Sequence, residues 1–317
     1  MKLAKENRQY GLWDSPISPL ILGRGITLAD VAWDSDGSLV WREGRSDRGV
    51  LVVKAVGEQA PRDFNSELSV RAKVGYGGGD FCAGHGNVYF AAAESGRIFR
   101  QPTQAGAAQP VTPAFGAAAA PTLSPDGRWL LYVHTYEGTD RVAIVDSQGV
   151  KCPAQLVSGD DFYMQPRWHP NGKQIAWIAW NHPNMPWDGT YLRQAKLEFP
   201  AGGLPVINET QTIAGDENTS IFQPEYSPDG RWLAYVSDES GWWQLYLYGL
   251  ESGERRQLTT EAAEHGSPAW VQGLRTYAFS PDSRSIFIIR NTEGFNSLWK
   301  IEIENGQMQR IPLATGY

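Results

Sequence analysis

The sequence is poor in cysteine, histidine and long apolar stretches. Its 317 residues include 2 Cys and 5 His, and nowhere do 18 apolar residues follow one another. Cys82 and Cys152 lie in no C-x-x-C pattern, which argues against a disulfide framework and against a zinc half-site. The first residues, MKLAKENRQYG, do not form an export signal. We therefore expect a cytoplasmic protein with no membrane segment.

Basic residues are too scattered for a nucleic-acid partner. The net charge is −7 at pH 7, and no run of Lys and Arg exceeds two residues. Aromatic residues, in contrast, make up 12% of the chain, with 34 Gly and 20 Pro beside them. Many short strands joined by tight turns require this composition, and 41% hydrophobic residues suffice for a large core. The composition predicts an all-β protein.

One short pattern recurs along the chain: an apolar or aromatic residue, a turn of the type Ser-Pro-Asp-Gly, and an alternating strand. The copies read AWDSDGSLVWRE, TLSPDGRWLLYV, RWHPNGKQIAWI, EYSPDGRWLAYV and AFSPDSRSIFII. In such a turn, Pro presets φ, Asp bonds the local backbone, and Gly takes the left-handed φ that closes the hairpin. Each copy is therefore predicted to form a β-hairpin.

The spacing of the copies predicts the blades of a propeller. Four successive turn positions lie 45, 58 and 53 residues apart, which suits four-stranded blades: Ser124, His169, Ser227 and Ser280. The gap before the first of these is twice as long, and a glycine-rich turn at residues 83–87 supplies the missing copy. We predict a β-propeller of six four-stranded antiparallel blades. The ring is either closed around six or left open as an incomplete seven-bladed ring.

No linker divides the chain, because the repeat continues in step along it. Residues 1–317 are therefore expected to form one propeller domain, with residues 1–29 as an arm that leads into the first blade. The Ala- and Gly-rich residues 106–120 are interpreted as a loop between blades. Residues 180–192, WNHPNMPWDGTYL, form an insertion with two Pro and two Trp.

The hairpins resemble the PD40 repeats of TolB-like proteins and of the propellers of prolyl oligopeptidase-family serine peptidases (peptidase family S9). Three segments resemble the acylaminoacyl-peptidase and dipeptidyl-aminopeptidase branch in particular: YGLWDSPISP (10–19), WREGRSDRGVLVV (41–53) and the insertion (180–192). The match runs from about residue 10 to the end of the chain and is to the propeller alone. The resemblance implies an amino-terminal domain that sits over an α/β-hydrolase domain, screens out large folded substrates and contributes to specificity.

The chain itself lacks the sequence pattern of a hydrolase nucleophile. An α/β hydrolase presents its serine on a G-x-S-x-G elbow, and no serine here lies in that pattern. The nearest approach surrounds Ser46, which we expect in a hairpin turn. We therefore expect no catalytic residue and no cofactor in this chain. Its expected partners are a missing C-terminal hydrolase domain and the short peptides that the parent serine exopeptidase would cleave.

Two other functions stay open at this point. One is a free-standing TolB-like protein-interaction propeller, and the other is a propeller lyase with a metal or carboxylate site in its channel. The five histidines show no ligand spacing, so no metal site is predicted.

By resemblance to the family, Glu43, Arg45 and Arg48 are candidate contacts with substrate or with the hydrolase domain. The interpretation that we favour is a solvated ion pair along a hairpin, which contributes little to stability.

In the insertion, Met185, Trp187 and Asp188 place adaptable apolar surface beside a carboxylate on an inter-strand loop, and loops often carry function. The alternative is that the Trp residues simply cap their blade. If the functional interpretation holds, the insertion lies on the face that the hydrolase domain would cover, and Met185 and Trp187 are unusually exposed.

Overall fold

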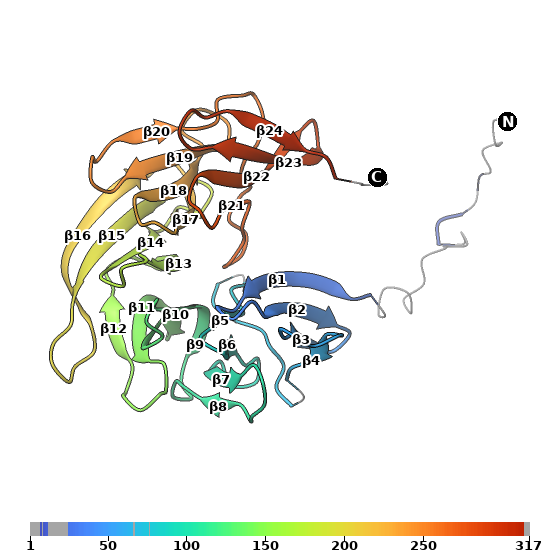
Figure 1. The fold of residues 1–317 in the computed structure, drawn as a ribbon, viewed down its shortest axis with the longest axis vertical. Coiled ribbons are helices and arrows are strands. Elements are labelled where there is room, and N and C mark those ends of the chain that lie inside the picture. The colour runs from blue at the N-terminus through green and yellow to red at the C-terminus, as the bar shows by residue number, and fades with distance from the viewer. Residues whose placement is uncertain (1–6, 8, 12–24, 66, 76, 314–317) are drawn as a thin grey trace.

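The structure is a computed structural model that describes residues 7, 9–11, 25–65, 67–75 and 77–313. These residues form six four-stranded antiparallel sheets around a common centre (Figure 1). The part of the chain that is described contains no helix long and apolar enough to cross a membrane. The architecture is a six-bladed β-propeller, as the sequence predicted.

The blades follow one another in chain order. Blade 1 is β1 (Thr27–Trp33), β2 (Leu39–Arg45), β3 (Arg48–Lys54) and β4 (Arg62–Asp63), and blade 2 is β5 (Phe81–Gly84), β6 (Asn87–Ala91), β7 (Ile98–Pro102) and β8 (Gln109–Pro110). Blade 3 is β9 (Ala117–Leu123), β10 (Trp129–Tyr136), β11 (Thr139–Asp146) and β12 (Ala154–Val157), and blade 4 is β13 (Phe162–Trp168), β14 (Gln174–Trp180), β15 (Tyr191–Glu198) and β16 (Val206–Gly215). Blade 5 is β17 (Ile221–Tyr226), β18 (Trp232–Ser237), β19 (Gln244–Gly249) and β20 (Arg255–Gln257), and blade 6 is β21 (Tyr277–Phe279), β22 (Ser285–Thr292), β23 (Phe295–Glu302) and β24 (Met308–Ile311).

Each sheet is built from four consecutive strands, and the first strand of each blade lies nearest the centre (Figure 1). Each predicted turn joins the first two strands of its blade, and residues 85–86 supply the turn of blade 2. β1 begins at Thr27, while most of the expected arm, residues 1–6, 8 and 12–24, lies outside the described residues. Every blade in the described part of the chain is therefore complete without a strand from the opposite end.

The interpretation of residues 106–120 as a loop is wrong at two places, because Gln109–Pro110 is β8, the outer strand of blade 2, and Ala117 begins β9. β9 begins at Ala117 and pairs with β10, so that Ala118 lies opposite His134. The alanines suit the crowded inner wall, because a Cβ added to Gly79 in the neighbouring blade would lie 2.9 Å from the backbone of Ala120. A run of small residues therefore marks close packing here and not a flexible connection.

The hairpin turns of neighbouring blades interlock. The backbone N–H of Gly86 in blade 2 donates to the Asp34 carboxylate in blade 1 at 2.9 Å. His169, which replaces the turn serine of blade 4, makes a 2.9 Å hydrogen bond between its Nε2 and the carbonyl of Gly230 in blade 5. The backbone N–H of Asp229 in blade 5 donates to Ser283 Oγ in blade 6 at 2.9 Å. The turns thus fasten the blades as well as reversing the chain.

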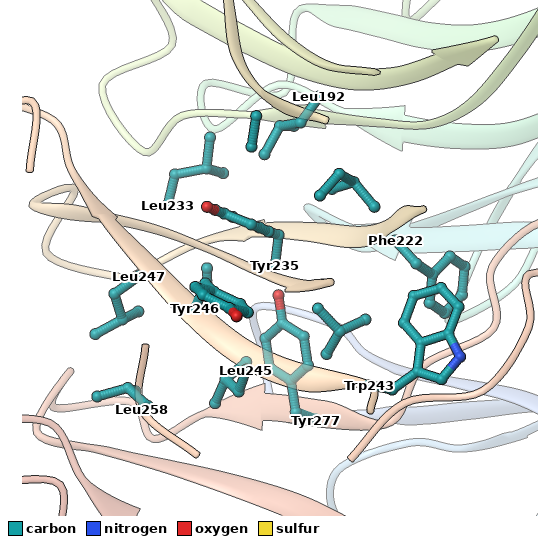
Figure 2. Close-up of a cluster of buried hydrophobic side chains, with 14 of the residues drawn as sticks. Leu192, Phe222, Leu233, Tyr235, Trp243, Leu245, Tyr246, Leu247, Leu258 and Tyr277 are labelled. Carbon is teal, nitrogen blue, oxygen red and sulfur yellow. The ribbon is translucent and has the colours of Figure 1, made fainter. Parts of the chain in front are cut away.

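Apolar side chains fill the spaces between blades. The largest cluster joins blades 4, 5 and 6, and Figure 2 shows it around Tyr235 and Tyr246, whose rings stack at 5.6 Å. Leu233 and Leu247 in this cluster are fully buried. A buried side chain of this size stabilises the fold by roughly 1.5 to 3 kcal/mol, so the interfaces between blades hold the ring together.

The interface between blade 6 and blade 1 is less packed than the others. Leu28 and Trp33 on β1 are 75% and 68% exposed. An open cleft of about 620 Å³ lies here, lined by β1, by residues 78–80 and by residues 271–278. We call this interface the seam.

Candidate functional site

The antiparallel order divides the connections between two faces. The Ser-Pro-Asp-Gly hairpins lie on one, the turn face. The connections between second and third strands, and the segments that lead from one blade to the next, lie on the other, which we call the loop face. The loop face includes the β2–β3 hairpin and the β14–β15 connection at residues 181–190, so both predicted groups of site residues lie there.

The first group forms local ion pairs. Arg45 donates from its Nη1 and Nη2 to the two carboxylate oxygens of Asp63, both at 2.7 Å, and from its Nε to Glu43 at 2.9 Å. Hydrogen bonds to Asp63 and then to Glu43 raise the pKa of Arg45. Trp41 Nε1 also donates to Glu43 at 2.9 Å, and Arg48 begins β3 opposite Arg45. This geometry matches the favoured interpretation of an ion pair along the hairpin.

In the second group, a short hydrogen-bonded turn shapes the insertion. The backbone N–H of Met185 donates to Asp188 Oδ2 at 2.8 Å, and the backbone N–H of Asp188 donates to the carbonyl of Met185 at 2.9 Å. Ser220 Oγ donates to the carbonyl of Pro186 at 2.6 Å, which ties the insertion to the segment before blade 5. The Asp188 carboxylate thus holds the loop, although its side chain is exposed.

Met185 and Trp187 are half-buried, so they are less exposed than expected. They are not buried inside their own blade either. The Trp187 ring packs against Trp270, with ring centroids 4.5 Å apart, and Trp270 belongs to the segment before blade 6. The insertion of blade 4 therefore contacts a second, longer loop from the other end of the chain.

That longer loop, residues 258–276, crosses the loop-face end of the central channel. Gln272 donates from its backbone N–H to the carbonyl of Gly77 before blade 2 at 2.8 Å. Its side-chain Nε2 donates to the carbonyl of Tyr163 in blade 4 at 2.9 Å, and its Oε1 accepts from the backbone N–H of Gln165 at 3.2 Å. Blades 2, 4 and 6 lie at different sides of the ring (Figure 1), so the loop joins opposite sides of the channel, and we call it the plug.

Two glutamines on the channel wall anchor this plug. Gln165 and Gln223 are fully buried, have left-handed φ values of 51° and 49°, and each precedes a proline. Gln165 Nε2 donates to the carbonyl of Leu274 at 2.9 Å, and Gln223 Oε1 accepts from the backbone N–H of Thr276 at 2.6 Å. The sequence interpretation missed both glutamines. The repeated Gln-Pro pairs in MQPRW and FQPEY were the available signal.

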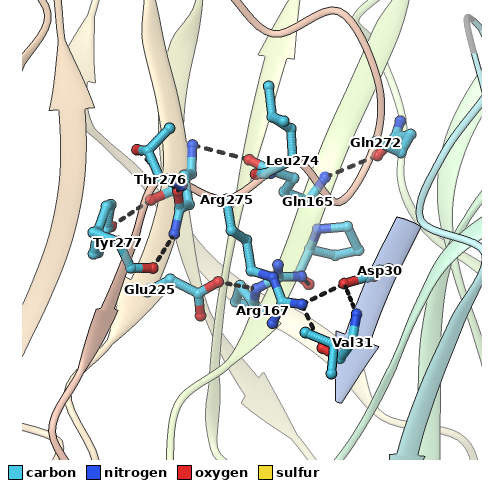
Figure 3. A network of polar contacts seen from close by, with 12 residues as sticks. Asp30, Val31, Gln165, Arg167, Glu225, Gln272, Leu274, Arg275, Thr276 and Tyr277 are labelled. Carbon is cyan, nitrogen blue, oxygen red and sulfur yellow. Dashed lines mark hydrogen bonds and ion pairs between the residues drawn. The ribbon is translucent and has the colours of Figure 1, made fainter. Parts of the chain in front are cut away.

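Charges along the channel wall are paired. Arg167 Nε donates to Glu225 Oε1 at 2.9 Å between blades 4 and 5. Arg275 pairs with Asp30 across the seam, and Figure 3 shows both pairs close to Gln165. Among the described residues, no three His, Cys, Asp or Glu side chains gather as a metal site would require. The wall is thus arranged to hold the blades in place.

A cavity of about 300 Å³ opens beside the plug. Its walls come from four blades or from the segments before them: residues 74–75, Asp140, residues 162–164, residues 180–186 and residues 270–272. The Phe162 ring stacks on Trp180 at 5.1 Å, and His182 meets Phe162 edge-on at 4.8 Å. Met185 is the one residue of the six sequence-predicted candidates that lines this cavity.

Comparisons with known proteins place this fold among peptidase propellers. No protein-family model matches the chain. Dipeptidyl-peptidase 5 of Porphyromonas gingivalis is 24% identical over 169 residues, which are 53% of this chain and 23% of that protein. The crystal structure of puromycin hydrolase superposes with a TM-score of 0.83 at 26% identity, over 97% of this chain and 50% of that one. A putative TolB from Agrobacterium tumefaciens, at 14% identity and a TM-score of 0.51, shares the fold alone.

The chain therefore spans about half the length of puromycin hydrolase, and its match to dipeptidyl-peptidase 5 spans about a quarter of that protein. Its homologues are prolyl oligopeptidase-family peptidases, and the propeller resembles the amino-terminal domain of that family. The structure describes two of the three segments on which the resemblance rests, residues 41–53 and 180–192. Most of the remaining segment, residues 12–19 of 10–19, lies outside the described residues.

Proposed function

We propose that this propeller is the gating domain of a serine peptidase, and that its loop face covers an α/β-hydrolase domain that cleaves short peptides. The likeness over 97% of the chain to one half of puromycin hydrolase supports this proposal most strongly. The family relationship implies a catalytic serine on a separate domain, and no serine in this chain lies in a nucleophile elbow.

The geometry of the loop face agrees with a gating role. The plug at residues 258–276 lies across the channel mouth, where Gln272 joins blade 4 to the segment before blade 2, and this position supports restricted entry along the channel axis. Two aromatic residues stand on the same face, exposed Trp270 of the plug itself and half-buried Trp187 of the insertion beside it. Such a surface suits a second domain or a peptide more than bulk water.

The first test uses the 317-residue chain alone. Acyl transfer needs a serine activated by a positioned base and an oxyanion hole, so we expect a cooperative thermal transition and no labelling by a fluorophosphonate probe. We also expect no release of nitroanilide from aminoacyl, acyl-aminoacyl or dipeptidyl substrates. Stoichiometric labelling of one serine of this chain, lost when that serine is replaced, would overturn the proposal.

The second test uses the complete polypeptide of the gene that encodes this chain. We expect a G-x-S-x-G elbow in a following domain. The enzyme should cleave short peptides and should cleave much more slowly a folded protein that contains the same cleavage sequence. Removal of the propeller should increase the relative cleavage of folded substrates if the isolated hydrolase domain stays folded. A gene product without a hydrolase domain would refute this function and favour a free-standing interaction propeller.

A further inference from the structure

The cavity beside the plug is lined almost entirely by aromatic, aliphatic and thioether groups. Phe162, Trp180, Met185 and Trp270 contribute side chains to it, and neither Lys nor Arg lines it. Flat rings and a flexible thioether give an apolar guest large contact areas without a fixed hydrogen-bond pattern. The lining therefore selects for apolar surface.

Among the polar residues that line the cavity, Gln272 already has partners for its side-chain amide, and we call the part of the cavity next to it the floor. The side-chain amide of Gln272 donates to the Tyr163 carbonyl at 2.9 Å and accepts from the Gln165 backbone at 3.2 Å. A guest that needs hydrogen bonds at its buried end would have to break these bonds, which would leave buried groups unpaired. The floor thus favours a guest that is apolar at its tip.

One acidic group, Asp140, borders the cavity. It is buried, and burial raises the pKa of its carboxyl group, while a hydrogen bond from Thr135 acts in the opposite direction. An anionic guest would meet this carboxylate and walls that are apolar except at His182 and Gln272, and both the carboxylate and the apolar walls are unfavourable for a negative charge. The lining therefore disfavours carboxylates.

The walls are held in place before any guest arrives. Phe162 stacks on Trp180 within blade 4, and Trp270 rests on Trp187 of the insertion. Trp270 is nevertheless 56% exposed, so one wall of the cavity opens to solvent on the loop face. A side chain can enter from that side while the chain that bears it stays outside.

We propose that this cavity is a binding site for one bulky aromatic side chain of a peptide, inserted tip first and free of negative charge. Its volume of about 300 Å³ is at the lower end of the range for ligand pockets, which fits a single side chain better than a larger molecule. The site does not depend on the peptidase proposal, because binding can be measured on this chain without hydrolysis.

The experiment is a titration of the 317-residue chain with three small probes, followed by saturation-transfer NMR. N-acetyl-phenylalanine amide should bind saturably, and N-acetyl-alanine amide should show no binding at the same concentrations. N-acetyl-phenylalanine, with a free carboxylate, should bind at least about tenfold more weakly than the neutral amide. Equal binding of the alanine probe or of the anionic probe would overturn the proposal.

Variants locate the binding. Trp270→Ala should weaken binding of N-acetyl-phenylalanine amide at least about tenfold. Trp242→Ala is the matched control, because Trp242 is 42% exposed and does not line the cavity, and it should leave the affinity unchanged. Met185→Ala gives a second variant should Trp270→Ala fail to fold. Unchanged affinity in a folded Trp270→Ala or Met185→Ala variant would refute the site.

Discussion

Arg275, in the loop before the last blade, pairs with Asp30 in the first strand of the first blade, and it donates a 2.5 Å hydrogen bond to the carbonyl of Val31. The Arg275 side chain thus joins the two ends of the ring at the seam. At the other interfaces, hydrogen bonds between hairpin turns or clusters of buried apolar side chains join neighbouring blades.

Replacement of Arg275 by alanine should loosen the seam more than the whole fold. The ion pair is partly exposed, so we expect a loss of about 1 kcal/mol in the free energy of unfolding. Amide hydrogen exchange in β1 should speed up about fivefold, and that of blades 3 to 5 should change less.

Arg231→Ala is the control for this prediction, because Arg231 pairs with Asp229 inside a single exposed turn. It should leave the exchange of β1 unchanged. If Arg275→Ala and the unaltered protein exchange β1 at the same rate, the ion pair does not hold the seam.

Gly78→Ala should be much more destabilising than Gly138→Ala. Both glycines have a left-handed φ, +80° and +74°, so both substitutions carry a backbone cost of about 1 kcal/mol. At Gly78, the new Cβ would also lie 2.3 Å from the carbonyl oxygen of Gln272 in the plug, whereas nothing lies within 4 Å at Gly138. Urea unfolding should show a further loss of at least about 2 kcal/mol for Gly78→Ala. Equal losses would mean that the plug moves away at little cost.

His265 should make the protein sensitive to mild acid. The imidazole is fully buried, and burial lowers its pKa to about 4, while Glu261 at 4.0 Å offsets only part of that effect. An unfolded chain takes up this proton below about pH 6.5, whereas the folded chain takes it up only near pH 4. The free energy of unfolding should therefore fall from pH 6.5 toward pH 4, by at most about 1.4 kcal/mol per pH unit from this group.

Urea titrations at pH 7, 6 and 5 measure this effect. His265→Gln should flatten the pH dependence in that interval, and His182→Gln, at an exposed position, should not. An identical slope in His265→Gln and in the unaltered protein would show that His265 is not the responsible group.

The two cysteines should differ strongly in reactivity. Cys152 is exposed, whereas Cys82 is half-buried and burial raises the pKa of its thiol to about 12, so few Cys82 thiolates exist at pH 8. A disulfide reagent should therefore titrate one thiol quickly and the second much more slowly, until denaturation exposes it. Cys152→Ser should remove the fast reaction, and its persistence would show that Cys82 is accessible.

The blades could be predicted because their signal is local. A Ser-Pro-Asp-Gly turn and an alternating strand specify a hairpin within about twelve residues, as in the copy that contains Ser227 and Gly230. Local reasoning gave the wrong result at Ala117. A run of small residues is typical of a loop, and the sequence does not show that another segment packs closely against this run and so requires small side chains there.

The site could be predicted only in part, because it forms between distant segments. Met185 was identified from its loop and does line the cavity, but Trp270 and Asp140 were not identified, since they reach the same place from other blades. The position of Gln165 opposite Gln272 joins residues 107 positions apart, and no short-range pattern encodes that distance. Only the Gln-Pro pairs hinted at a special inner strand.

The arrangement of every blade from four consecutive strands has a consequence for biosynthesis. As the chain leaves the ribosome, each blade can form as soon as its own outer strand has appeared, and it can pack at once on the blade before it. At any moment, a single advancing face of apolar residues is uncovered. The face of blade 1 that meets the seam stays uncovered until Arg275 has been synthesised. Chaperones that act on the nascent chain therefore have two targets: β1, from early in synthesis, and the uncovered face of whichever blade has formed last.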